Sequence, residues 1–241
     1  MTVNRRRAGA VFRKELREYR RNRSLVVGMA VIPLVFLVQP LISVFTTGAS
    51  AASELGQRHE LLYLLGIPAL VPATLAAYAV VGERQQGTLE PVLGTPIRRE
   101  ELLLAKALAV LVPSMGISYA VYGLFLALVE LFANDAVAHA LIRGPDVLAQ
   151  LLFTPLLAAW SIWIGIAISA RSSDIRVAQQ LGALASLPSI AVTTLIAINV
   201  IHATLGLALV LAAALLVANR VGWRVVSALF DRERLITGTT P

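Results

Sequence analysis

Residues 82–102 read GERQQGTLEPVLGTPIRREEL and form a polar segment between two apolar runs, 61–81 and 107–129. The segment holds seven formal charges, whereas the flanking runs hold none. About 20 apolar residues cross the hydrocarbon core of a bilayer, so each flanking run is long enough for one transmembrane helix. The segment is therefore a charged connection between two membrane spans, and its length suggests a contact surface.

Two helix starts lie within this connection. Thr88 can cap a helix whose first turn contains Glu90 and Pro91, because a hydroxyl accepts an orphan backbone N–H and a carboxylate opposes the positive helix end. Thr95 followed by Pro96 has the same form, with proline at the first helical position. These signals predict a short helix along the membrane surface and a second helix that turns into the third span. An ordinary solvated connector is the alternative.

The overall composition is that of an integral membrane protein. Apolar residues make up 57% of the 241 residues and charged residues only 15%, whereas about a quarter of a soluble domain is charged. The chain has no cysteine, which excludes a disulfide framework, a thiolate metal site and a cysteine nucleophile. The basic region up to Arg23, followed by a long apolar run, is not the pattern of a cleaved secretory signal.

Charge-free runs predict six spans in a single all-α transmembrane domain, residues 1–241. The run Val177–Asn219 has 43 residues, and as one helix it would be roughly 64 Å long, about twice the thickness of the membrane core. We therefore expect it to fold back near Asn199–Thr204. The predicted spans are 25–45, 61–81, 107–129, 147–170, 177–198 and 203–219.

The distribution of basic residues supports this topology. With both termini in the cytoplasm, 19 of the 21 Lys and Arg residues lie inside and only Arg58 and Arg143 lie outside. If Val177–Asn219 crossed once, residues 220–241 would lie outside and the balance would fall to 15 against 6. The net charge of +7 therefore reflects topology and attraction to lipid, and a nucleic-acid partner is not indicated.

Residues 1–24 are expected to form a cytoplasmic basic helix in the membrane interface. Phe12, Leu16 and Tyr19 fall on one face at helical spacing, while arginines and lysines occupy the others. Anionic headgroups hold such a helix by about 1 kcal/mol per basic residue. A charge cluster that only fixes topology is the alternative, and under either interpretation the segment is an anchor without chemistry of its own.

Enzyme motifs are absent from the sequence. It has no GxxxxGK[ST] phosphate loop, no HExxH and no GxSxG, so we expect no catalytic, cofactor or metal residue in this chain. His59, His139 and His202 fall in or near predicted outer loops and are too far apart in sequence to suggest a site. The spans also lack the mid-depth ionisable residues that ion-coupled transporters use, so energy for uphill transport is expected to come from a partner.

Residues 83–106 closely resemble the segment after the second span of ABC-2-type transporter permeases. The pattern of that family is an acidic residue, then Gly-Thr-Leu-Glu, any two residues, a Leu, then Thr/Ser-Pro, a basic-acidic stretch and a Lys that opens the third span. The tail 228–236, ALFDRERLI, is similar to the closing Leu-Phe-x-Arg-Glu segment of the family. The resemblance covers the whole chain, from the basic amphipathic N-terminus through six spans to the cytoplasmic tail.

This resemblance implies the membrane subunit of an ATP-driven exporter in the plasma membrane of a prokaryote. Two permeases, either two copies of this chain or this chain and a similar one, would bind two separate ABC ATPase subunits that hold ATP and Mg. The helix 87–93 would be the cytoplasmic coupling helix, which inserts into a groove of the ATPase. Leu89 and Leu93, four residues apart, would be buried there. The residues expected to dock are Glu83, Gly87, Thr88, Leu89, Glu90 and Leu93.

The sequence does not identify the substrate. Aromatic residues recur at a spacing of three on the third and fourth spans, and a stripe of this kind can line a path for an apolar or amphipathic compound. Helix packing and interfacial belts are the alternative explanation. The residues of this possible path are Tyr119, Tyr122, Phe125, Trp160 and Trp163. A non-transporting membrane anchor or regulatory subunit, which binds a soluble partner through residues 83–101, is the alternative function.

Overall fold

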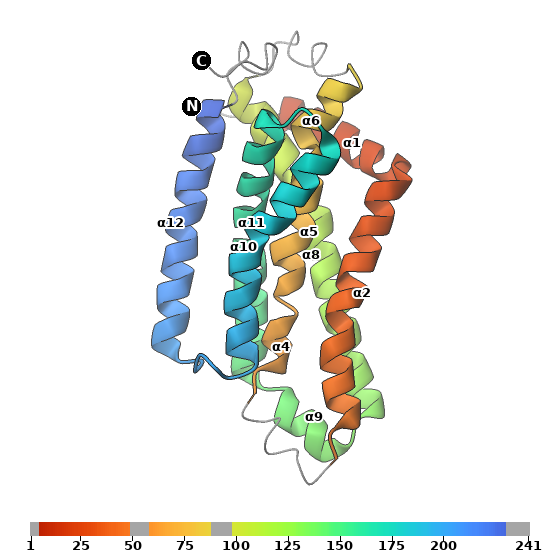
Figure 1. The fold of residues 1–241 in the computed structure, drawn as a ribbon, viewed down its shortest axis with the longest axis vertical. Coiled ribbons are helices and arrows are strands. Elements are labelled where there is room, and N and C mark those ends of the chain that lie inside the picture. The colour runs from red at the N-terminus through yellow and green to blue at the C-terminus, as the bar shows by residue number, and fades with distance from the viewer. Residues whose placement is uncertain (1–4, 49–57, 88–97, 230–241) are drawn as a thin grey trace.

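A computed structural model describes residues 5–48, 58–87 and 98–229 of the chain, and these residues form a bundle of long helices (Figure 1). Six helical segments are long and apolar enough to cross a membrane, so the prediction of six spans is confirmed for the described residues. The helices are α1 (Arg5–Arg21), α2 (Arg23–Thr46), α4 (Glu60–Tyr63), α5 (Gly66–Ala76), α6 (Tyr78–Gln85), α8 (Arg99–Phe132), α9 (Asp135–Leu141), α10 (Gly144–Arg171), α11 (Ile175–Ala197) and α12 (Leu205–Leu229).

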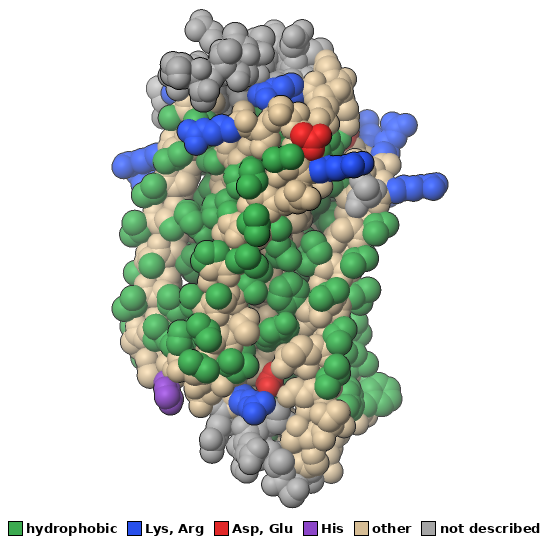
Figure 2. Space-filling view, in the orientation of Figure 1, with side chains coloured by type: hydrophobic (Ala, Val, Ile, Leu, Met, Phe, Trp, Pro, Cys, Tyr) green, Lys and Arg blue, Asp and Glu red, His purple; other side chains and the backbone are tan. Residues whose placement is uncertain are grey.

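One end of the bundle is rich in Lys and Arg, and we call it the basic end (Figure 2). Helix α1, the end of α6 and the start of α8 lie there, and the described chain also begins and finishes there, as six crossings require (Figure 1). Helix α9 and the turn between α11 and α12 lie at the opposite end (Figure 1). The long uncharged run folds back at this turn, where Asn199 adopts a positive φ of 60°, a conformation that asparagine tolerates better than most residues.

The second crossing, Glu60–Gln85, lies at the centre of the bundle. Its most apolar window is 89% buried, compared with 6% for the last crossing, Leu205–Leu229. It is divided into α4, α5 and α6 by turns at 64–65 and at Ala77. Pro68 and Pro72 both lie in the middle piece, α5, and a proline lacks the N–H that a helix hydrogen bond requires. The second crossing is buried on several sides, so the neighbouring helices must approach it closely.

Small residues make this close approach possible. A Cβ atom added at Gly165 of α10 would lie 2.7 Å from the carbonyl oxygen of Ala73 and 2.7 Å from the Cβ of Ala76, both in α5. In α11, a Cβ at Gly182 would lie 3.2 Å from the same carbonyl oxygen. Small residues at membrane helix contacts permit this backbone proximity. Three helices therefore meet around the alanines of α5.

We expect Gly165→Val to destabilise the bundle, because its side chain would have to displace the backbone of α5. Overpacking of this kind costs about 1–3 kcal/mol. Thermal unfolding in detergent, followed by tryptophan fluorescence, measures the effect. Gly116→Val is the matched control, because nothing lies within 4 Å of a Cβ added there. Equal midpoints for the two variants would contradict the close contact between α5 and α10.

Candidate functional site

The structure describes both ends of the polar connection but not residues 88–97 between them. Gly87, at the first end, has a positive φ of 67°, the left-handed conformation that commonly ends a helix, and its N–H donates to the carbonyl of Arg84. At the second end, helix α8 begins at Arg99. The predicted docking residues Thr88, Leu89, Glu90 and Leu93 lie outside the described residues.

The predicted helix start at Thr95-Pro96 lies outside the described residues, and α8, which leads into the third span, begins at Arg99. Arg98 is extended, with φ −77° and ψ 146°, and is the N-cap residue of α8. Its backbone N–H donates to the carboxylate of Glu101 at 3.2 Å, and this carboxylate stabilises the start of the helix together with Glu100. The helix extends over 34 residues, about 50 Å, so its first turns project beyond the hydrocarbon core.

A buried lysine lies where this projecting part of α8 meets the bundle. The side chain of Lys106 is 0% exposed, and its ammonium group contacts three acceptors. It lies 2.8 Å from Glu15 Oε1 of α1, 2.7 Å from Glu83 Oε2 of α6 and 2.8 Å from the carbonyl oxygen of Ala79. An ammonium group has three N–H donors, so each donor has an acceptor.

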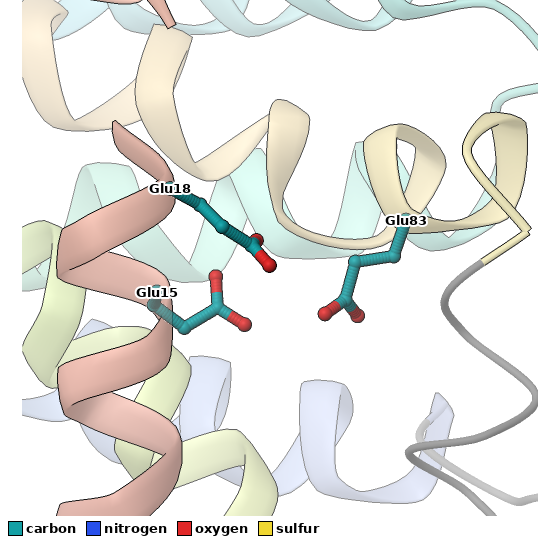
Figure 3. Close-up of side chains that lie close together, drawn as sticks. All are labelled: Glu15, Glu18 and Glu83. Atoms are coloured by element: carbon teal, nitrogen blue, oxygen red, sulfur yellow. The ribbon is translucent and has the colours of Figure 1, made fainter. Parts of the chain in front are cut away.

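Lys14 completes the group that we call the lysine–glutamate cluster, consisting of Lys14, Glu15, Glu18, Glu83 and Lys106. The Lys14 ammonium donates to Glu83 Oε1 at 2.6 Å and lies 3.2 Å from Glu18 Oε1. Figure 3 shows Glu15 and Glu18 of α1 and Glu83 of α6 pointing toward one another. Burial lowers the pKa of Lys14, but the hydrogen bond and charge of Glu83, with the charges of Glu15 and Glu18, hold that pKa above its ordinary value.

The carboxylates of this cluster have the spacing of a metal site. Oxygen atoms of Glu15, Glu18 and Glu83 lie within 4.8 Å of one another. The ammonium groups of Lys14 and Lys106 already lie among these oxygens at ion-pair distances. The lysines therefore supply the positive charge that a metal ion would otherwise provide, and the geometry is that of a salt-bridge network.

The end of α6 is also bound to the connection between α10 and α11. The Arg84 guanidinium donates to the carbonyl oxygens of Ser172 and Ala170, at 3.1 and 3.3 Å. The Ser169 hydroxyl accepts from two backbone N–H groups of α6 at 3.0 Å each. The segment immediately before residues 88–97 is thus attached to α1, α8 and α10 together.

The sequence interpretation missed the role of helix α1. The segment was expected to act only as an interfacial anchor, but Ala8, Glu15 and Tyr19 are buried against the bundle and Glu15 pairs with Lys106. The signal was the position of Glu15, four residues before Tyr19 and therefore on the same helix face. A carboxylate on an otherwise apolar face indicates a buried cation opposite.

Glu83 is likewise buried within the chain, with 2% of its surface exposed. It was expected to contact the ATPase, and that contact stays a prediction. In the chain itself the carboxylate is held by Lys14 and Lys106. Glu83 therefore fixes the start of the polar connection, whatever binds to residues 88–93.

The aromatic residues of the possible substrate path occupy packed positions. Tyr122 and Phe125 are buried in the core, and the hydroxyl of half-buried Tyr119 donates to the carbonyl of Leu151 at 3.0 Å. Trp163 contacts α12, where its indole N–H donates to Asn219 Oδ1 at 3.1 Å and its ring meets Trp223 edge-on. Trp160 is half-buried on α10. A role of these residues in a substrate path stays a prediction.

A second polar cluster lies at the opposite end of the bundle. His59 Nδ1 is 2.7 Å from Asp146 Oδ1, and Arg143 Nη2 is 2.8 Å from Asp146 Oδ2. The arginine also donates to the carbonyl oxygen of Arg58 at 2.7 Å. These contacts join the start of the second crossing to the start of α10, so His59 has a structural partner that its sequence position did not indicate.

A comparison with protein-family models matches residues 9–217 to the ABC-2 family transporter proteins. No curated protein shows a significant match. The matched region begins within α1 and ends within α12, so it includes the first five crossings, part of the sixth and the lysine–glutamate cluster. The chain therefore belongs to the ABC-2 family of transporter proteins, and it is a multi-pass membrane permease.

Proposed function

We propose that this permease is the membrane half of an ATP-driven exporter, and that residues 88–93 dock into separate ATPase subunits that bind ATP and Mg. The polar connection lies at the basic end, which by the positive-inside rule faces the cytoplasm. ATP is available on that side. The family membership supports a permease role, and the permease component of such a transporter is distinct from its ATPase.

The lysine–glutamate cluster is the observation that carries this proposal. Glu83 lies at the start of the connection and Lys106 follows its end. The two side chains pair with each other and with residues of α1. A force on residues 88–93 would therefore displace α6, α8 and α1 as one body. Rigid-body movement of packed helices is an established form of conformational coupling. ATP-driven closure of the ATPase pair would tilt the spans through the contacts of the lysine–glutamate cluster.

The proposed orientation predicts the location of the termini. A reporter fused after Pro241 should be cytoplasmic, and one inserted within 136–143 should be external, because these positions lie at opposite ends of the predicted topology. Enzymatic reporters that are active on only one side of the membrane measure this directly. A C-terminal reporter found outside would contradict the docking of residues 88–93 on a cytoplasmic ATPase.

Assembly tests the proposal at the level of the complex. We expect the full-length chain, co-expressed with its ATPase, to give two permease and two ATPase subunits in native mass spectrometry. ATP hydrolysis by this complex in detergent should increase when a transported compound is added. An ATPase that never responds, or a permease that binds no ATPase, would favour a membrane anchor. A transport-competent monomer would contradict the paired arrangement.

A further inference from the structure

A pocket of about 580 Å³ opens at the basic end. It lies between the end of the second crossing and the elbow at Asn22, which joins α1 to α2. Its volume falls within the range of about 300–1,000 Å³ typical of small-molecule sites. The lining residues are Glu18, Arg21, Asn22, Arg23, Tyr78 and Gln86. We propose that this pocket binds the phosphodiester headgroup of an anionic phospholipid.

The charges of the pocket point to an anion. Among the described residues, no carboxylate lies within 4.0 Å of the guanidinium of Arg21 or Arg23. Glu18, the acidic residue of the lining, lies 3.2 Å from Lys14. The lining therefore carries a net charge of +1 before Lys14 is counted. Guanidinium groups bind phosphate oxygens in pairs of parallel hydrogen bonds, which makes a phosphodiester the matching group.

The position of the pocket points to a lipid as the source of this phosphate. Asn22 caps α2, and the apolar run of the first crossing begins at Leu25. The pocket thus lies at the level where headgroups meet the hydrocarbon core. Val26 and Val27, in the first two turns of α2, are 45% and 58% exposed. Acyl chains can follow this apolar surface while the headgroup stays beside the arginines.

The far wall of the pocket also suits a headgroup. Tyr78 is largely buried, and its hydroxyl accepts a hydrogen bond from the Gln86 amide. Tyrosine is favoured at membrane interfaces because its ring is apolar and its hydroxyl is polar. A headgroup held by Arg21 and Arg23 would lie against Gln86, three residues beyond Glu83. It would therefore join the elbow to the last turn before residues 88–97.

Native mass spectrometry of the full-length chain in neutral detergent tests this site, with palmitoyl-oleoyl phosphatidylglycerol as the probe. We expect one tightly retained lipid, and an affinity at least tenfold lower in the Arg21→Gln/Arg23→Gln variant, because the variant loses both guanidinium contacts to the phosphate. A tenfold loss corresponds to about 1.4 kcal/mol. The matched control is Arg17→Gln/Arg20→Gln, which removes the same charge from exposed positions of α1 outside the pocket. It should retain the lipid as the unmodified chain does.

Three results would overturn the proposal. Equal losses in the two variants would mean that the arginines act only through general attraction to charge. Equal retention of phosphatidylcholine would show that the pocket does not select an anionic headgroup. Displacement of the lipid by glycerol 3-phosphate at a comparable concentration would assign the site to a soluble phosphate ester. Because lipid binding is measured without the ATPase, failure of this site leaves the proposed transport function standing.

Discussion

Leu89→Arg should abolish transport and release the ATPase, while membrane insertion and folding stay intact. Leu89 and Leu93 lie four residues apart, on one face of the predicted short helix, and a few fully buried residues at the centre of an interface carry most of its binding energy. A buried guanidinium without a partner at that contact is strongly unfavourable. Co-purification of the ATPase with the variant, compared with the unmodified chain, measures the loss.

The matched control is His139→Arg, which adds a positive charge at an exposed position of α9, at the opposite end of the bundle. It should retain the ATPase in full. If residues 88–97 are only a solvated connector, Leu89→Arg is a surface change worth within about 0.5 kcal/mol and should be nearly silent. Unchanged co-purification together with unchanged transport would eliminate the docking model.

Lys106→Met should severely destabilise the permease. The substitution leaves the carboxylates of Glu15 and Glu83 buried without Lys106 between them, and breaking a buried ion pair in this way costs about 3–5 kcal/mol. Thermal unfolding in detergent and the yield of folded protein report the change. Lys14→Met is the control, because Lys14 binds the same Glu83 but its side chain is 34% exposed. Its removal should cost at most about 1 kcal/mol.

A triple variant separates coupling from stability. Glu15→Leu and Glu83→Leu, combined with Lys106→Met, replace the buried charges by apolar side chains, and such replacements are often neutral for stability. We expect the triple variant to fold and to bind the ATPase, but to transport poorly, because the three helices are no longer joined by directed contacts. Transport at the unmodified rate would limit the cluster to a stabilising role.

The number of spans could be predicted because it depends on length and charge alone. An uncharged run of 43 residues cannot cross once, and the described helices fold back within it. The ends of the helices were harder to predict, since a charge at the end of an apolar run can face either water or another helix. Lys106 was counted among the cytoplasmic charges that fix topology, yet it is fully buried.

The pairing at the site could not be read from local patterns. Glu15 and Lys106 are 91 positions apart, and only the packing of α1 against α8 brings them together. Pro68 and Pro72 lie within the second crossing, but proline alone does not show where a helix is divided or whether it is central. Periodicity identifies apolar faces, whereas the choice between a lipid and a neighbouring helix depends on tertiary structure.

Cross-linking from a single cysteine tests the central claim most directly, because the chain has no cysteine of its own. The full-length Leu89→Cys permease is co-expressed with its ATPase and then labelled with a benzophenone maleimide. On illumination it should cross-link to the ATPase. The same label on His139→Cys, at the opposite end, should not. A Leu89→Cys product that contains only permease or lipid, in a complex that still hydrolyses ATP and transports, would contradict docking through residues 88–93.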